Sequence, residues 1–295
     1  MNNTLTIFAI GAFAAVALGI ADFFGARASK TVGPITAAFF VQVAGTVAFC
    51  VWYLIAVTQV PELAGATWAY ALAGALLIAA GMCTLYLAFE RGPVSLASPL
   101  SAAYPLVTAA VGVLFFGAAL SAAACVAVVV IVVGIMAAAG LFNVDKNERT
   151  ISAGPRLALL TTLFWGLAYP LLGAAIDVAG WEIVTLIQLV AMVPVLGVML
   201  LLRRRQEGLT AMRLTLALRS PFVLAAGLLQ MLAVLAINVG FGLDQAAGTM
   251  VVTTSAAYPV ITMLLALRHF DEHADKLTLA GAGATIAGVL ALHTF

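Results

Sequence analysis

The stretch SAAYPLVT at residues 101–108 recurs as SAAYPVIT at residues 255–262, with six of the eight positions identical. The two copies are 154 residues apart, and the same spacing aligns Phe116 with Phe270 and Gly134 with Gly288 without a gap. A short match in an alanine-rich chain carries little weight alone, but a register that continues beyond the motif indicates an internal repeat. The sequence therefore predicts two related halves.

The composition places both halves in a membrane. Of 295 residues, 64% are hydrophobic and only 8% are charged. A soluble domain carries about 25% charged residues, so a soluble enzyme, a nucleic-acid binder and a disordered chain are all excluded. The apolar runs are long and continuous, whereas the strands of outer-membrane barrels alternate between apolar and polar residues. We therefore expect an all-α integral membrane protein.

Ten apolar runs approach the roughly 20 residues that a spanning helix needs. They lie at 5–27, 34–57, 68–90, 94–117, 119–141, 153–176, 182–202, 219–243, 246–268 and 276–294. The first five-helix repeat is expected at 1–142 and the second at 150–295, with a cytoplasmic linker at 143–149. Because five is odd, the second repeat enters the membrane from the opposite side, which is an inverted repeat typical of secondary transporters.

The basic residues predict the orientation. All thirteen Lys and Arg residues fall in the loops that follow odd-numbered spans, and none falls on the other side. Positive loops stay cytoplasmic. We therefore expect a multi-pass protein of the bacterial cytoplasmic (inner) membrane, with both termini on the outer, periplasmic side.

Several features together resemble the EamA type of the drug/metabolite transporter superfamily. They are the ten spans in two inverted halves, the pair Trp165-Gly166 near the start of one half with its weaker counterpart Leu18-Gly19, and small residues leading into Pro105 and Pro259. The chain departs from the family where an acidic residue often follows span four, because Ala118 stands there, whereas Glu272 follows span nine.

The resemblance implies an alternating-access exporter of small molecules, and the chain looks most like bacterial aromatic amino acid exporters of the YddG kind. The central site of such a transporter would lie between the two halves. A monomer is expected to function, although small residues of span ten leave a dimer face open, namely Ala280, Ala284 and Gly288.

The repeated motif supplies the first candidate site residues. On helical spacing, Ser101, Tyr104, Pro105 and Thr108 share one face, and Ser255, Tyr258, Pro259 and Thr262 repeat it. A mid-span phenol needs a hydrogen-bond partner, and a mid-span proline kinks its helix. We interpret Pro105 and Pro259 as hinges of cavity-lining helices. The alternative is that the small residues only permit close packing.

Aromatic and amide side chains complete the predicted substrate site. Trp165 and Tyr169 are one turn apart on span six, and Met82 and Tyr86 are one turn apart on span three. Buried amides act as interhelical bonds or as substrate contacts. Of the four amides within spans, Gln42 and Asn238 are favoured for the site over Gln188 and Gln230.

Ionisable residues give weaker indications. Asp22 is the one acid well inside a span, where it either reaches towards the cytoplasmic face or couples transport to protons. His269 and His273 have a metal-binding spacing in a short loop, but no HExxH motif accompanies them. We expect no cofactor, no metal site and no catalytic residues, so the protein is not predicted to be an enzyme.

The leading function is therefore export of amino acids, aromatic or hydrophobic ones above all, or of related small metabolites. The expected partners are this small-molecule substrate and the lipid bilayer, and no nucleic acid is expected to bind. Aromatic faces without fixed charge also suit organic cations or drugs. A passive channel and a non-transporting sensor or interaction subunit stay open as alternatives.

The orientation predicts that the start of the first span is accessible from outside. In a variant in which Cys50, Cys83 and Cys125 are replaced by serine, Asn3→Cys should react with a membrane-impermeant maleimide on intact cells. Reaction only after the cytoplasmic face is opened would contradict the argument from charge.

Overall fold

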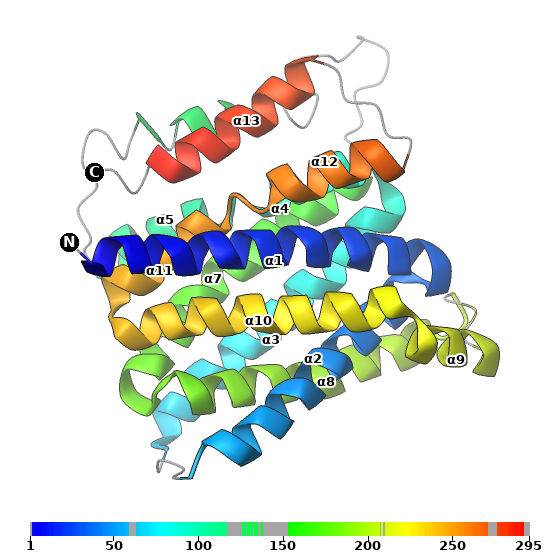
Figure 1. Cartoon of the computed structure of the whole chain (residues 1–295), viewed down its shortest axis with the longest axis horizontal. Helices are drawn as coiled ribbons and strands as arrows, with labels where there is room; N and C mark the ends of the chain where they lie inside the picture. Colours follow the sequence, from blue (N-terminus) through cyan, green and yellow to red (C-terminus); the bar gives the residue numbers. More distant parts are fainter. Residues whose placement is uncertain are drawn as a thin grey trace.

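The protein is described here by a computed structural model, whose long helices lie side by side in a bundle (Figure 1). The structure describes residues 2–58, 63–116, 153–206, 208, 210–270 and 276–291, with eight further positions between 126 and 137. The described residues are helices and short links and contain no strand. Among the described residues, seven segments are long and apolar enough to cross a membrane, and one of them, Met250–His269, runs across the link between α11 (Gln245–Ser255) and α12 (Pro259–His269).

The observed helices follow most of the predicted spans. Spans one to three correspond to α1 (Asn2–Val32), α2 (Pro34–Ala56) and α3 (Gly65–Arg91). Spans six, seven, eight and ten correspond to α7 (Ala153–Ala179), α8 (Trp181–Arg203), α10 (Pro221–Leu243) and α13 (Lys276–Ala291). The linker at 143–149 and most of span five lie outside the described residues, and the described positions of span five are helical.

Spans four and nine are broken rather than kinked, which corrects the prediction that each motif copy shares one helical face. Span four is α4 (Val94–Ser101) followed by α5 (Tyr104–Phe116), and span nine is α11 (Gln245–Ser255) followed by α12 (Pro259–His269). Each break falls inside the repeated motif. Pro105 and Pro259 have no N–H group, so the helix cannot continue its hydrogen-bond ladder through them. Ser101 and Tyr104 therefore lie on different helices.

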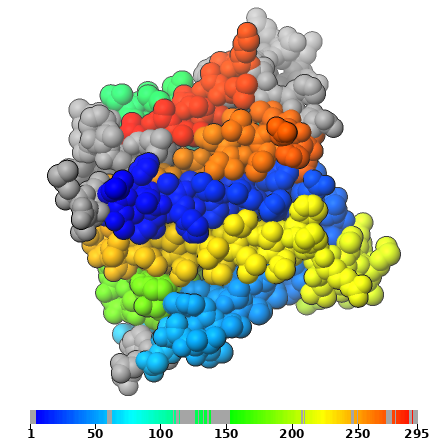
Figure 2. All heavy atoms as spheres, in the orientation of Figure 1, coloured from blue at the N-terminus to red at the C-terminus, as the bar shows by residue number. Residues whose placement is uncertain are grey.

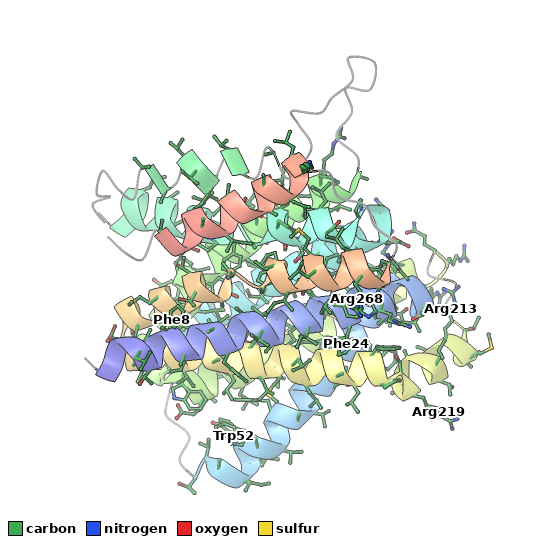
Figure 3. All side chains as sticks on the ribbon, turned by 45° about the horizontal axis from the view of Figure 1, so that its top comes forward. Phe8, Phe24, Trp52, Arg213, Arg219 and Arg268 are labelled. Atoms are coloured by element: carbon green, nitrogen blue, oxygen red, sulfur yellow. The ribbon has the colours of Figure 1, made fainter. Side chains whose placement is uncertain are left out.

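A further short helix, α9 (Ala211–Arg219), lies in a stretch that the sequence predicted as a loop. The hydroxyl group of Thr210 accepts a hydrogen bond from the backbone N–H of Arg213 and so caps its start. Most of its apolar side chains stay exposed: Met212 is 78% exposed and Leu218 is 68% exposed. In Figure 3, Arg213, Arg219 and Arg268 lie at one end of the bundle, away from Phe8 and Trp52.

Two glycines make the tight reversals between consecutive spans. Gly33 joins α1 to α2 with φ of 98°, and Gly180 joins α7 to α8 with φ of 85°. Residues other than glycine rarely adopt backbone angles in this left-handed region. Gly33 and Gly180 are 147 residues apart, which is also the spacing between Gly19 and Gly166.

The helices pack in reciprocal pairs. The most extensive contacts are those of α3 with α7, and of α1 with α10. Figure 2 shows α1 at the surface between α10 and α12. In terms of the predicted spans, these are span three with span six and span one with span eight, so the third span of each predicted half packs on the first span of the other.

Glycines at helix crossings bring the motif copies against α1 and α7. A Cβ atom at Gly19 of α1 would lie 2.7 Å from the carbonyl oxygen of Tyr258. A Cβ atom at Gly166 of α7 would lie 2.8 Å from the carbonyl oxygen of Tyr104, the matching residue of the other copy. Such close approach leaves no space for a side chain.

The crossings predict a stability effect. Gly19→Ala and Gly166→Ala should each destabilise the folded protein by about 1–3 kcal/mol, because the added methyl group overlaps backbone atoms that cannot move aside. Thermal unfolding of the detergent-solubilised protein measures this.

Gly283→Ala is the matched control, because its Cβ would meet nothing within 4 Å. An unfolding temperature of Gly166→Ala equal to that of Gly283→Ala would contradict the close packing.

Candidate functional site

The two helix breaks face each other and exchange hydrogen bonds. The phenol of Tyr104 lies 3.2 Å from the hydroxyl oxygen of Ser255, and the phenol of Tyr258 lies 2.7 Å from that of Ser101. Ser101 and Ser255 are fully buried, and Tyr104 and Tyr258 are each 1% exposed. The prediction that these phenols need partners is therefore met by the serines of the opposite motif copy.

Backbone carbonyl groups at the breaks take part in the same exchange. The carbonyl oxygen of Ser98 accepts hydrogen bonds from the Ser101 hydroxyl at 2.8 Å and the Tyr258 phenol at 3.4 Å. The carbonyl oxygen of Val252 accepts the matching bonds, from the Ser255 hydroxyl at 2.6 Å and the Tyr104 phenol at 3.3 Å. The two carbonyl groups also accept from the backbone N–H groups of Ala102 and Ala256, so each phenol adds a bond from one break to the backbone of the other.

Threonine hydroxyls tie the breaks to α1 and α7. Thr108 donates to the carbonyl oxygen of Gly166 at 3.0 Å, and Thr262 donates to that of Gly19 at 3.1 Å. Thr162 of α7 donates to the carbonyl oxygen of Leu100 at 2.6 Å, which compensates for the ladder interrupted after α4. Thr162 was not among the predicted site residues, because in the sequence it is marked only as a polar residue within an apolar run.

Three aromatic rings gather beside the first break. Tyr104 meets Trp165 edge-on with 5.9 Å between ring centroids, and lies 5.2 Å from Tyr169. The indole N–H of Trp165 donates to the carbonyl oxygen of Ile78 at 3.3 Å, and its ring covers Gly81. The structure therefore brings together Tyr104, Trp165 and Tyr169, and their contact with substrate stays a prediction.

Met82 and Tyr86 lie on α3 near this group but have other partners. The sulfur of Met82 accepts a hydrogen bond from the Gln230 amide at 3.8 Å. Tyr86 packs its hydroxyl group against Gly25 of α1 and its ring against Phe89. Both side chains are buried, and their contact with substrate stays a prediction.

The amides Gln42 and Asn238 hold helices together in this structure. Gln42 donates to the carbonyl oxygen of Leu189 at 3.0 Å, which joins α2 to α8. Asn238 donates to the Thr185 hydroxyl at 2.8 Å and the Gln188 amide oxygen at 3.0 Å, which joins α10 to α8. Of the two interpretations of buried amides, this geometry shows interhelical bonding, and substrate contact stays untested.

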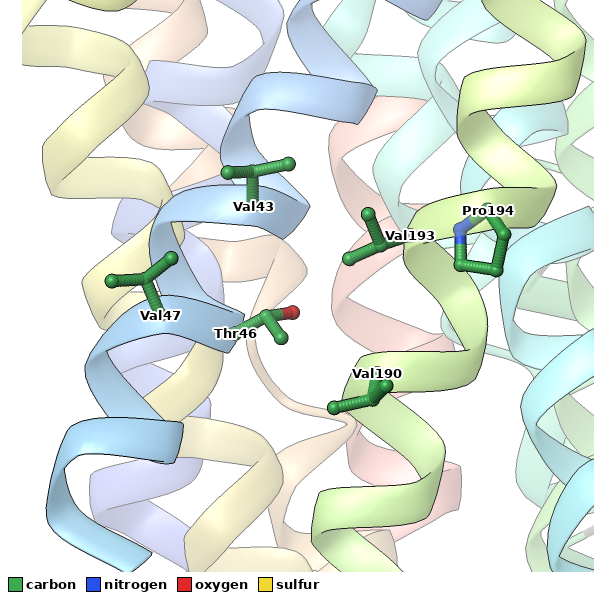
Figure 4. A pocket seen from close by; sticks show the side chains of 6 residues that line it. All are labelled: Val43, Thr46, Val47, Val190, Val193 and Pro194. Carbon is green, nitrogen blue, oxygen red and sulfur yellow. The ribbon is translucent and has the colours of Figure 1, made fainter. Parts of the chain in front are cut away.

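A groove of about 300 Å³ lies between α2 and α8 (Figure 4). Its walls are mainly valine, and the flanking Val47 and Val190 are 58% and 45% exposed. The Thr46 hydroxyl there already donates to the carbonyl oxygen of Leu189. This apolar groove lies on the surface of the bundle and is distinct from the buried residues at the two breaks.

Small residues of span ten pack within the chain. A Cβ atom at Gly288 would lie 3.1 Å from the carbonyl oxygen of Ala127, and one at Gly134 would lie 2.8 Å from that of Gly281. This pair repeats the reciprocal pattern. Gly288, one of the three residues of the possible dimer face, therefore packs against span five of the same chain.

Within the described residues, no group of three or more His, Cys, Asp or Glu side chains is placed to hold a metal ion. Ala118, Glu272 and His273 lie outside the described part of the chain. His269 at the end of α12 bonds through its ring nitrogen to the carbonyl oxygen of Leu265.

Comparison with known proteins finds a family similarity in the first part of the chain. Residues 5–139 match the EamA-like transporter family, so this stretch of the multi-pass membrane protein is similar to that family. The match covers somewhat less than half of the chain.

Solved structures extend the likeness to the whole fold. One, titled "Crystal structure of protein", is 17% identical and superposes with a TM-score of 0.70 over 98% of both chains. At this identity the likeness concerns the fold alone. No protein of curated function matches the sequence.

The capping role of Thr162 predicts a specific loss. Thr162→Val keeps the shape of the side chain but leaves the Leu100 carbonyl without its hydroxyl donor, which should cost about 1 kcal/mol of stability. Thr162→Ser keeps the hydroxyl and should lose less. Thermal unfolding compares the two, and equal losses would show that packing of the threonine methyl group matters more than the bond.

Proposed function

We propose that this protein is an alternating-access transporter that exports aromatic or hydrophobic amino acids, or related small metabolites, across the bacterial cytoplasmic membrane. The observation that carries the proposal is the reciprocal hydrogen bonding of the two helix breaks, Tyr104 with Ser255 and Tyr258 with Ser101. The similarity of residues 5–139 to the EamA-like transporter family supports a transport function.

The proposed architecture is ten spans in two inverted repeats, 1–142 and 150–295, with both termini outside. The contact of Gly19 with Tyr258 matches that of Gly166 with Tyr104, which supports it. Two such halves can exchange their conformations, which gives two packings, each open to one side of the membrane. The breaks at Pro105 and Pro259 are the proposed hinges, because backbone rotation there needs no continuous helix to be unwound.

The proposed site lies where the breaks meet the rings of Tyr104, Trp165 and Tyr169. Half-helices present N–H groups at their starts and carbonyl groups at their ends. The positive ends of the helix dipoles at the starts of α5 and α12 favour a carboxylate, and the negative ends at the close of α4 and α11 favour an ammonium group. The aromatic rings then receive an apolar side chain, which fits an aromatic amino acid zwitterion and the exporter subtype that the sequence resembles.

An organic cation is the second candidate. The faces of aromatic rings attract cations, and the three rings of the group carry no fixed charge. Competition by organic cations against a labelled amino acid separates the two substrate classes.

Transport by purified protein in liposomes tests the proposal. Radiolabelled tryptophan or phenylalanine should enter saturably and be blocked by unlabelled aromatic amino acids. Linear, unsaturated flux would indicate a channel, and flux equal to that of empty liposomes for amino acids and cations alike would overturn the transport function.

Trp165→Ala should abolish most of this flux without loss of folded protein. Truncating an aromatic ring at the centre of a binding site costs about 2 kcal/mol or more, roughly thirtyfold in affinity. Trp165→Phe should keep part of the activity, because a ring remains beside Tyr104.

Trp68→Ala is the matched control, because Trp68 lies near the start of α3 and is 43% exposed. Flux of Trp165→Ala equal to that of Trp68→Ala would remove Trp165 from the site.

A further inference from the structure

Asp22 lies buried on α1, close to the first helix break. Its side chain is 9% exposed, and its carboxylate oxygen Oδ2 is 3.5 Å from the hydroxyl oxygen of Ser98 on α4. The sequence left open whether Asp22 reaches the cytoplasmic face. The structure instead directs it into the protein, one helical turn from Gly19, which contacts Tyr258.

The basic residues of the same helix are engaged elsewhere. The guanidinium group of Arg27 lies 4.5 Å from the centre of the Phe222 ring on α10, and the ammonium group of Lys30 lies 3.8 Å from the centre of the Phe270 ring. Within the described part of the chain, Asp22 forms no ion pair and receives one weak hydrogen bond, from Ser98.

The other ionisable groups around Asp22 do not supply a cation. The phenols that interact electrostatically with Asp22 are Tyr86 of α3, Tyr104 of α5 and Tyr258 between α11 and α12. His269 of α12 is 5.3 Å from the ring of Phe23 and bonds to its own helix. The remaining ionisable groups on helices that contact α1 are, by sequence, Cys50 and Tyr53 of α2, Tyr70, Cys83, Glu90 and Arg91 of α3, Arg213 and Arg219 of α9, and Arg268 of α12, whereas α4, α10 and α11 bring none.

An ionised carboxylate in this position lacks the compensation that a buried charge needs, whereas the neutral acid does not need it. Asp22 is also joined to the breaks. Ser98 bonds to it through its hydroxyl group, and the carbonyl oxygen of Ser98 accepts from Ser101 and Tyr258. A change of charge on Asp22 therefore acts directly on the residues that hold the two breaks together.

We infer that Asp22 is a proton-binding site that couples substrate export to proton entry. When the site opens outwards, the carboxylate takes a proton from external water and becomes the neutral acid. When it opens to the cytoplasm, the acid returns that proton to water and regains its charge, so one proton enters for each export step. This inference rests on the proposed transport function.

The test uses two transport modes of the purified protein in liposomes. Substrate exchange at equal pH on both sides needs no net proton movement, whereas accumulation driven by a pH gradient does. Asp22→Asn, which imitates the permanently protonated acid, should lower the ratio of gradient-driven flux to equal-pH exchange about tenfold or more. Asp22→Glu should restore much of the ratio, and Glu90→Gln, an exposed acid at the end of α3, should leave it unchanged.

An unaltered ratio in Asp22→Asn, or a wild-type protein that shows exchange but no response to a gradient, would overturn the coupling. If no substrate moves in any mode, the proposed function fails separately. Infrared spectroscopy still tests proton binding without substrate. The carbonyl stretch of a protonated carboxylic acid should appear in wild-type protein at neutral pH and be absent from Asp22→Asn, and a wild-type spectrum without that band would refute the site.

Discussion

Hydroxyl groups buried inside an apolar bundle must find hydrogen-bond partners, and the centre of this protein is organised by that requirement. The motif breaks two helices, and each break supplies a serine and a tyrosine to the other. The carbonyl groups of Ser98 and Val252 receive bonds from both sources. The same two carbonyl groups also accept from the backbone N–H groups of Ala102 and Ala256, so the side-chain hydrogen bonds between the two breaks add to the apolar contact that holds these segments together.

The sequence predicted the helices well because length and hydropathy determine them. It predicted the motif breaks only as kinks. A proline removes one hydrogen bond in any helix, but whether the helix bends or ends depends on which donors lie nearby. Here Thr162 from a distant helix meets the carbonyl group of Leu100, and nothing in the local sequence of α4 indicates that partner. Helix α9 was missed because its nine residues, two of them arginine, do not form the long apolar run that predicts a spanning helix.

The candidate site was predictable in part. Mid-span tyrosines imply partners, and the repeat indicated that the two copies would meet. The sequence placed Tyr104, Trp165 and Tyr169 in one predicted site, but the packing of span four on span six that brings their rings together depends on the tertiary structure. The partners of Gln42 and Asn238 did not follow, because an amide in an apolar run bonds equally well to a helix or to a substrate. The depth of Asp22 also depends on tertiary packing, since a sequence position near Arg27 permits either direction.

The two connections that would correspond in related halves are unequal. The stretch between α2 and α3 is short, whereas the stretch between α8 and α10 holds the capped helix α9 with its exposed leucines. Perfectly matched halves would give two conformations of equal free energy. In the proposed alternating-access cycle, an extra helix at one end would add interactions that differ between the two conformations and would bias the resting population to one side. A ligand must then overcome that bias before the opposite conformation dominates. Helix α9 would thus set the free-energy difference between the two proposed conformations.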